Sequence, residues 1–103
     1  MSKPSYSKPS YADQLYILKL YVTGSSPRSE QAIANLMRLC EQQLSGGYEL
    51  SIIDVLEQPD LAEQEKILVT PTLIKEVPPP GQRIIGDLSD TTTLARGLDL
   101  HTL

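Results

Sequence analysis

The chain has few of the residues on which catalytic chemistry usually depends. Its 103 residues include one cysteine and one histidine, and it has neither tryptophan nor phenylalanine. The single cysteine, Cys40, cannot form an internal disulfide, which fits a reducing compartment. The single histidine, His101, lies near the end and argues against a histidine-based triad or a histidine-rich metal site. These absences favour binding over catalysis, and we expect neither a cofactor nor a metal.

Long hydrophobic runs and clusters of basic residues are also missing. The longest apolar run is far shorter than the roughly 20 residues that cross a bilayer, and the first residues lack the hydrophobic core of a signal peptide. The net charge is −4 and the basic residues are scattered, which argues against a nucleic-acid partner. We therefore expect a cytoplasmic protein that binds neither membranes nor nucleic acids.

The N-terminal segment is repetitive. Residues 2–11 consist of the pentapeptide Ser-Lys-Pro-Ser-Tyr twice in tandem. Proline and serine at this density oppose regular structure, so we interpret residues 1–14 as a disordered tail and residues 15–103 as a single domain. A tail that is phosphorylated or that binds a partner is the alternative interpretation.

The first half of the domain has strong local patterns. Residues 15–22 form a nearly continuous apolar run, which is typical of a strand covered on both faces. Ser26 and Pro27 predict the start of a helix, and apolar residues at helical spacing continue it to residue 44. Residues 48–56 predict a second strand. A strand, a helix and a strand in this order predict a right-handed unit with two parallel strands.

The second half of the domain has weaker local preferences. Residues 59–66 predict a short helix, and residues 72–77 and 83–85 predict strands on either side of the proline-rich turn 78–81. Residues 91–97 follow a Ser-Asp cap and predict a last helix.

Two segments of this half are ambiguous. Residues 67–69 are apolar and are compatible with an extension of the preceding helix or with a strand. Thr91, Thr92 and Thr93 are β-branched and favour a strand over a helix. An ambiguous second half beside a well-specified first half is what a protein with two alternative folds requires.

The segment Val69-Thr70-Pro71-Thr72 resembles the proline-bearing loop that enters the third strand of thioredoxin-like domains. Redox proteins of that fold carry Cys-x-x-Cys after their first strand, where residues 23–29 of this chain contain no thiol. The resemblance implies a cis peptide bond at Pro71 in the thioredoxin-like state, and a trans proline that starts a strand is the alternative. The backbone before Pro71 would offer an edge to an extended partner.

Other polar side chains have structural explanations. Cys40 lies on the apolar face of the predicted helix and is expected to be buried and unreactive. Asp87 and Asp90 suit turn and cap positions. Carboxylates cluster between residues 54 and 65, but their spacing fits no metal-ligand template, so we interpret them as a solvated acidic face. Its members are Asp54, Glu57, Asp60, Glu63 and Glu65.

Several segments together resemble the KaiB family of cyanobacterial clock proteins. The resemblance covers about residues 15–100 and is most specific between residues 66 and 89. The segments are Leu18-Lys19-Leu20-Tyr21-Val22, Ile53-Asp54-Val55-Leu56, Lys66-Ile67-Leu68, Thr70-Pro71-Thr72-Leu73, Pro78-Pro79-Pro80, Arg83-Ile84-Ile85-Gly86-Asp87-Leu88-Ser89 and Gly97-Leu98-Asp99-Leu100. It implies a single α/β domain of the thioredoxin-like class that is metamorphic. The resting fold has the element order βαββααβ, and the switched, thioredoxin-like fold has the order βαβαββα.

The resemblance implies a regulator that is not an enzyme. Family members in the rare, monomeric switched fold bind the N-terminal ring of the ATPase KaiC, and the resting fold is usually a tetramer. Bound KaiB captures KaiA and competes with a histidine kinase whose sensor domain is KaiB-like. A KaiC-type ATPase is therefore the implied partner, in a clock or clock-like phosphorylation cycle. A KaiA-like protein or a KaiB-domain histidine kinase is a further implied partner.

Matching positions imply roles for particular residues. Lys66 and Arg83 match charges that contact KaiC. The resemblance also implies residues that take part in the fold switch. Some set the relative stability of the two folds, and others are prolines of the C-terminal half, which rearranges. These residues are Tyr16, Pro71, Pro78, Pro79, Pro80, Gly97 and Asp99. A plain surface or packing role is the alternative for each of them.

The chain also departs from the family pattern. Residues 23–29 differ from the usual Ala-Gly-Asn-Thr-Pro-Asn-Ser, Gly81-Gln82-Arg83 stands where Val-Arg-Arg is common, and Glu57 replaces a frequent lysine. Lost positive charge would change partner choice, which suggests a divergent paralogue with its own KaiC-type partner. Two other functions stay open. One is a KaiB-like adaptor in stress or histidine-kinase signalling. The other is a thioredoxin-like thiol enzyme, although the missing thiol argues against it.

Overall fold

Seven helices and strands form the part of the chain that the structure describes, which is residues 15–44, 47–98 and 100 of a computed structural model. They are β1 (Tyr16–Val22), α1 (Pro27–Gln43), β2 (Tyr48–Asp54), α2 (Pro59–Gln64), β3 (Thr72–Val77), β4 (Gln82–Ile85) and α3 (Thr91–Gly97). The observed order is βαβαββα, which is the thioredoxin-like order of the two that the resemblance implies.

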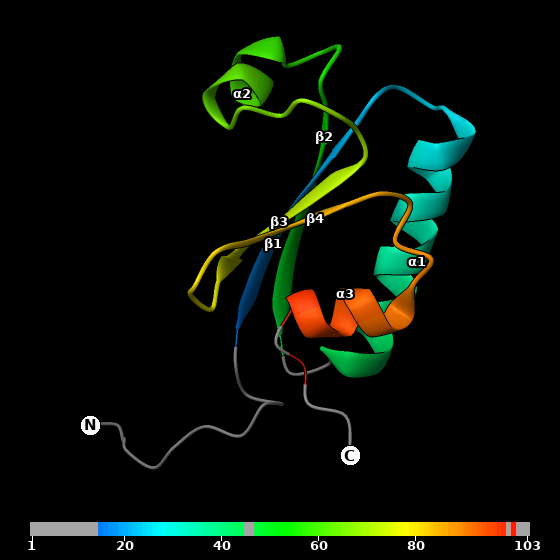
Figure 1. The fold of residues 1–103 in the computed structure, drawn as a ribbon, viewed down its shortest axis with the longest axis vertical. Coiled ribbons are helices and arrows are strands. Elements are labelled where there is room, and N and C mark those ends of the chain that lie inside the picture. The colour runs from blue at the N-terminus through cyan, green and yellow to red at the C-terminus, as the bar shows by residue number, and fades with distance from the viewer. Residues whose placement is uncertain (1–14, 45–46, 99, 101–103) are drawn as a thin grey trace.

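The four strands form one mixed sheet in the order β2-β1-β3-β4. Strand β1 pairs in parallel with β2 and antiparallel with β3, and β4 pairs antiparallel with β3. The parallel unit expected from the first half of the sequence is therefore confirmed. Helices α1 and α3 lie over one face of the sheet, and α2 lies at the end where β1 and β2 finish (Figure 1).

The hydrophobic core is divided by the sheet. The larger cluster joins alternate residues of β1, including Leu18 and Leu20, to α1 and to Leu94 and Leu98 at α3. On the opposite face, the smaller cluster centres on Tyr21 and is closed by side chains of α2 and the segment that follows it. Each fully buried leucine contributes about 1.5–3 kcal/mol relative to an exposed one, so both clusters fix the sheet between its helices.

Helix α1 begins where the sequence predicts it. The Ser26 side chain accepts a hydrogen bond from the Ser29 backbone N–H, and Pro27 occupies the first turn, where its missing N–H costs nothing. The helix ends at Gln43, one residue before the expected end. Cys40 is buried in its apolar face, as expected.

The segment 67–69 forms neither a helix nor a strand, so both structures considered for it are wrong. Helix α2 ends at Gln64, and Lys66 has a left-handed backbone with φ 56°, which reverses the chain and stops the helix. Strand β2 is also shorter than expected and ends at Asp54, because the Asp54 side chain accepts the Leu56 N–H and turns the chain. These local hydrogen bonds override the apolar pattern of both segments.

Helix α3 forms although three β-branched residues open it. The Asp90 carboxylate accepts hydrogen bonds from the Thr93 backbone N–H at 3.1 Å and from the Thr93 hydroxyl at 2.8 Å. Buried Leu94 then anchors the helix in the larger cluster. A cap and one core contact therefore outweigh the strand preference of the threonines. Among the described residues, no helix is long and apolar enough to cross a bilayer.

We predict that helix α3 loosens in acid. The Thr93 backbone N–H, which donates to the Asp90 carboxylate, lowers the pKa of Asp90 below its usual value. A lowered pKa means that this cap is fully present above about pH 4 and is lost as the pH falls through the folded-state value. An NMR titration should show falling amide protection in α3 over that range. Asp90→Asn, which still caps but does not titrate, should remove the pH dependence at this end, and an unchanged profile in that variant would contradict the assignment.

Candidate functional site

The carboxyl ends of β1 and β2 and the start of β3 meet at one end of the sheet, at the top of Figure 1. Three large apolar side chains are exposed on the loops there: Leu56 at 69%, Leu68 at 90% and Val69 at 48%. We call these three residues the loop-end apolar surface. Beside it lies a cavity of ≈ 260 Å³, which is lined by Thr23, Val55, Pro59, Ala62, Ile67, Leu68, Val69 and Thr70.

Hydroxyl groups occupy the loop in which a thioredoxin-like redox protein carries its thiols. The buried Ser29 hydroxyl accepts a hydrogen bond from the Thr23 N–H at 3.2 Å and bonds the Ser26 hydroxyl at 2.9 Å. The Thr23 and Thr70 hydroxyls lie 2.6 Å apart and bond each other. This network links the turn after β1 to the loop before β3 without any redox-active group.

Asp54 links the same turn to the loop after β2. Its Oδ1 accepts hydrogen bonds from the Gly24 N–H at 3.0 Å and from the Leu56 N–H at 2.9 Å. Gly24 has φ 55°, a left-handed conformation that glycine adopts without strain. Asp54 is therefore a structural member of the acidic group expected from the sequence. No group of potential metal ligands forms among the residues that the structure describes.

The loop before β3 is fixed at Pro71, which is buried. The Thr70–Pro71 peptide bond is cis, the isomer that the resemblance implies. The Thr72 hydroxyl donates to the Val69 carbonyl at 2.7 Å, and the Gly86 N–H donates to the Pro71 carbonyl at 3.0 Å. Bonds on both sides of Pro71 thus hold the backbone that carries Leu68 and Val69. The Val77–Pro78 and Pro79–Pro80 bonds in the turn between β3 and β4 are also cis.

The structure brings together Lys66 and Arg83, the two residues matched to partner contacts. The Arg83 guanidinium donates to the Lys66 carbonyl at 3.4 Å and to the Glu65 carbonyl, and it lies 3.6 Å from the Glu65 carboxylate. Arg83 therefore supports the end of α2. The Lys66 side chain is exposed, and Lys66 lies two residues before Leu68 in the sequence.

Two of the residues matched to the fold balance hold α3 in place. The buried Tyr16 hydroxyl donates to the Leu98 carbonyl at 3.0 Å, which joins the start of β1 to the end of α3. A methyl group on Gly97 would lie inside van der Waals contact with the Ile84 side chain, so α3 approaches β4 as closely as glycine allows. Asp99 lies outside the described residues.

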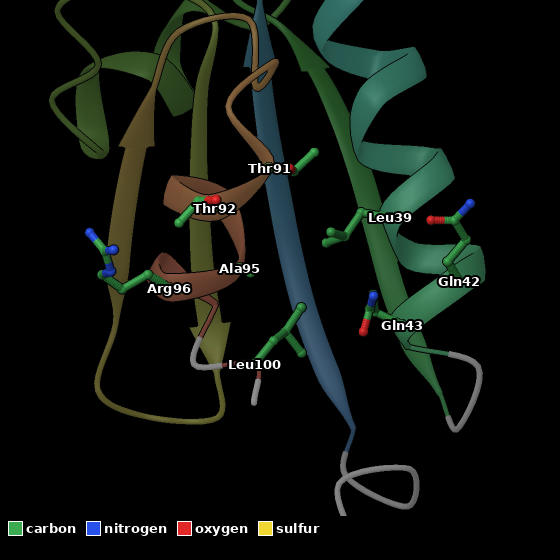
Figure 2. A pocket seen from close by; sticks show the side chains of 8 residues that line it. All are labelled: Leu39, Gln42, Gln43, Thr91, Thr92, Ala95, Arg96 and Leu100. Carbon is green, nitrogen blue, oxygen red and sulfur yellow. The ribbon is translucent and has the colours of Figure 1, made fainter. Parts of the chain in front are cut away.

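A larger cavity lies elsewhere, between the end of α1 and α3 (Figure 2). It measures ≈ 550 Å³ and is lined by both polar and apolar side chains. The lining residues are Leu39, Gln42, Gln43, Thr91, Thr92, Ala95, Arg96 and Leu100. None of the residues matched to partner contacts or to the fold switch lines this cavity, so the loop end remains the candidate site.

Thiol chemistry has no suitable group in the described part of the chain. Cys40 is fully buried in α1, and burial raises the pKa of its thiol to about 11. A thiol with so high a pKa forms almost no thiolate near neutral pH and is a poor nucleophile.

Comparison with known proteins places this arrangement in a family. The KaiB domain model matches residues 19–100. The chain belongs to the KaiB family. The circadian clock protein KaiB3 of Synechocystis is 61% identical over 80 residues, which cover 78% of each chain. The circadian clock oscillator protein KaiB of a Prochlorococcus marinus strain is 55% identical over 78% of this chain and 76% of its own. The homologues are thus KaiB circadian clock proteins.

Solved structures support the fold. The N-terminal domain of SasA from Synechococcus elongatus superposes with a TM-score of 0.68 at 27% identity, over 97% of this chain and 99% of that one. Mitochondrial thioredoxin 3 of Saccharomyces cerevisiae superposes with a TM-score of 0.67 at 18% identity, over 86% and 81% of the two chains. The second likeness shows the thioredoxin-like fold alone.

Sequence reasoning missed the loop-end apolar surface and the role of Asp54. Leu68 and Val69 were part of an apolar run that favours burial, and only the tertiary structure shows that they face solvent. The proline two residues after Val69 was the available signal, since a residue before proline seldom continues a helix.

We predict that Asp54→Ala destabilises the domain by about 1.5–3 kcal/mol, because the Gly24 and Leu56 N–H groups lose a charged acceptor. Chemical denaturation should show a lower midpoint with an unchanged slope. Asp54→Asn keeps an acceptor oxygen and should lose less. Glu57→Ala, at an exposed neighbouring carboxylate, should stay within about 0.5 kcal/mol of the parent. Equal losses of stability in Asp54→Ala and Glu57→Ala would contradict the structural role of the Asp54 hydrogen bonds.

We also predict that Tyr16→Phe weakens the attachment of α3 by about 1 kcal/mol, because the Leu98 carbonyl loses its buried donor. Hydrogen exchange should accelerate in α3 more than in α1. Tyr48→Phe removes the hydroxyl of a half-buried tyrosine on β2 and is the matched control. A uniform change across the domain would show that the Tyr16 hydroxyl has no local effect on α3.

Proposed function

We propose that this protein is a non-enzymatic KaiB-type regulator that binds a KaiC-type ATPase in a clock or clock-like phosphorylation cycle. The observation that carries the proposal is the loop-end apolar surface, which is exposed on loops that hydrogen bonds hold together. The loop after β1 contains no thiol. Exposed apolar side chains on fixed loops lose little conformational entropy when a partner covers them. Membership of the KaiB family supports this class of partner.

We further propose that binding occurs through a slow fold switch. The thioredoxin-like state has the element order of the binding-competent fold, and a tetrameric resting fold would have the other order. If the competent state is a minor population, the apparent affinity for the ATPase falls by that fraction. Tyr16, Gly97 and Asp99 are the proposed balance points. The hydrogen bond of Tyr16 to the residue after α3 and the close approach of Gly97 to Ile84 of β4 are the physical basis for two of them. Dilution would favour the monomer by mass action.

Charge around the loop-end apolar surface bears on partner choice. Lys66 lies on one side of it, and exposed carboxylates at residues 57, 60 and 63 lie on the loop and helix beside it. A mixed border of this kind would discriminate against a partner that presents acidic groups opposite Glu57. This supports a KaiC-type partner specific to this chain, with a KaiA-like protein as a third component.

An adaptor in histidine-kinase or stress signalling is the second proposal. The likeness to the N-terminal domain of SasA, which extends over nearly the whole of both chains, favours it. Two domains with the same fold could compete for one partner surface. A thiol enzyme is the least supported function, since the loop after β1 carries hydroxyl groups in place of thiols.

We predict that Leu68→Ser weakens binding to the KaiC-type partner by about 10-fold or more, because a fully exposed leucine contributes on the order of 1.5–3 kcal/mol when it becomes buried. Met37→Ser changes an equally apolar side chain, 44% exposed on α1, and should leave affinity unchanged. Biolayer interferometry with ATP-loaded ATPase measures both. Equal effects of the two variants would place the interface elsewhere.

Size-exclusion chromatography with light scattering, after incubation for hours with candidate KaiC-type ATPases and ATP, tests the function as a whole. The expected result is slow conversion of the free protein into a ring-sized complex with one of them. A chain that joins no KaiC-type ATPase but elutes with a histidine kinase would support the second proposal instead.

A further inference from the structure

The cavity between the end of α1 and α3 is suited to an amphipathic side chain. Leu39 of α1 and Leu100 beyond α3 point into it from opposite sides, and Ala95 of α3 also lines it (Figure 2). The Leu100 N–H donates to the Ala95 carbonyl at 2.9 Å, which holds this wall in place. The exposed side chains of Gln43 and Thr91 border the same space and offer polar groups. A ring with a hydroxyl at its tip would contact both kinds of surface.

The first residue of β1 is hydrogen-bonded beside both walls of this cavity. The Tyr16 N–H donates to the Gly47 carbonyl at 3.2 Å, on the segment that follows α1. The Tyr16 hydroxyl donates to the Leu98 carbonyl at 3.0 Å, directly after α3. Figure 2 shows the start of β1 at the end of the cavity where Leu100 and Gln43 lie. The segment that precedes β1 therefore joins the domain next to the cavity.

That preceding segment carries two side chains of the required kind. Residues 1–14 lie outside the described part of the chain and include the tandem Ser-Lys-Pro-Ser-Tyr repeat, with Tyr6 and Tyr11 at its two ends. At about 3.3 Å per residue, Tyr11 can reach about 17 Å from Tyr16 and Tyr6 about 33 Å. The proline two residues before each tyrosine restricts the backbone, so less conformational entropy is lost on docking.

Tethering favours the tail over an unattached ligand. A segment joined to the domain beside its site has an effective concentration on the order of millimolar, so a contact of millimolar affinity is occupied about half of the time. The cavity volume of ≈ 550 Å³ falls within the range of about 300–1,000 Å³ of pockets that hold small molecules, which is enough for a tyrosine and its neighbours.

Charge does not oppose this occupant. Arg96 is the charged residue among those that line the cavity, and Figure 2 shows its side chain directed away from α1. Lys8 lies three residues before Tyr11, so its ammonium group can stay in water while the tyrosine enters.

We propose that this cavity is the docking site of the chain's own N-terminal tail and that Tyr11 is the side chain that enters it. Tyr6 takes its place when Tyr11 is absent. The docked tail covers the gap between α1 and α3. The loop-end apolar surface lies at the other end of β1 and stays free. The docking is therefore independent of the proposed function, and its failure would leave that function untouched.

A nitroxide label on the tail of the full chain tests the docking. Ser7→Cys places an accessible thiol four residues before Tyr11, whereas Cys40 is buried with a raised pKa and stays unlabelled. We expect the label to broaden the NMR amide signals of residues 39–43 and 91–96 more than those of α2, which lies at the far end of the sheet. Equal broadening at the two ends would overturn the proposal.

Replacing the tyrosines shows whether their rings carry the contact. Tyr6→Ala combined with Tyr11→Ala should remove the excess broadening beside the cavity. Tyr6→Phe combined with Tyr11→Phe keeps the rings and should retain most of it. An alanine variant that broadens these signals as much as the parent would show that the tail is merely nearby, which would also overturn the proposal.

Filling the cavity tests the other side of the contact. Ala95→Gln places a longer side chain in the space and keeps a good helix former, so it should reduce the excess broadening to the level of the alanine variant. Ala34→Gln makes the same change at an exposed position of α1 and should have no effect. Equal broadening in these two variants would place the tail elsewhere.

A mixed sample separates the chain's own tail from that of a second copy. Labelled protein without ¹⁵N is mixed with unlabelled ¹⁵N protein, so broadening is seen only if a tail reaches another molecule. We expect none at residues 39–43 and 91–96. Broadening there in the mixture would assign the cavity to a second copy. Its absence both in the mixture and in the labelled ¹⁵N chain would leave the cavity to an outside ligand. Either result would overturn the proposal.

Discussion

Burial of strand β1 on both faces is the constraint on which the rest of the structure depends. Its alternate side chains reach α1 and α3 on one face, and Tyr21 reaches the α2 side on the other. It pairs with β2 and β3 along both edges, so every strand except β4 is placed directly against it. Because the ends of these three strands are fixed relative to one another, the loops that extend them meet at a single end of the domain.

At that end, hydrogen bonds between polar groups join the loops, as a disulfide or a metal ion does in other small domains. The Asp54 carboxylate and the hydroxyls of Thr23, Ser29 and Thr70 join the loops after β1 and β2 to the loop before β3. The polar network lies beneath, and the apolar side chains of Leu56, Leu68 and Val69 remain outside. Such an arrangement suits recognition, since the backbone is held while the side chains stay available.

The second half of the domain combines firm attachment with local strain. Asp90 caps α3 and Tyr16 anchors its end, but Gly97 leaves no room against Ile84 and Lys66 adopts a conformation better suited to glycine. Net stability is only a small difference between large opposing terms, so a contribution of about one or two kcal/mol changes the population of a state severalfold. This half is also the one in which local sequence preference was ambiguous.

The sequence by itself determined the first strand, the capped helix α1, the missing thiol and the family, because periodicity, caps and motifs are local properties. It did not reveal the path of residues 67–69 or the exposure of Leu68, nor the bonds of Asp54 to Gly24 and of Arg83 to the end of α2. These depend on which segments the sheet brings together. An apolar run has the same pattern whether it is buried or exposed, and only the packing of Ile67 against the cluster of Tyr21 decided that its neighbours face solvent.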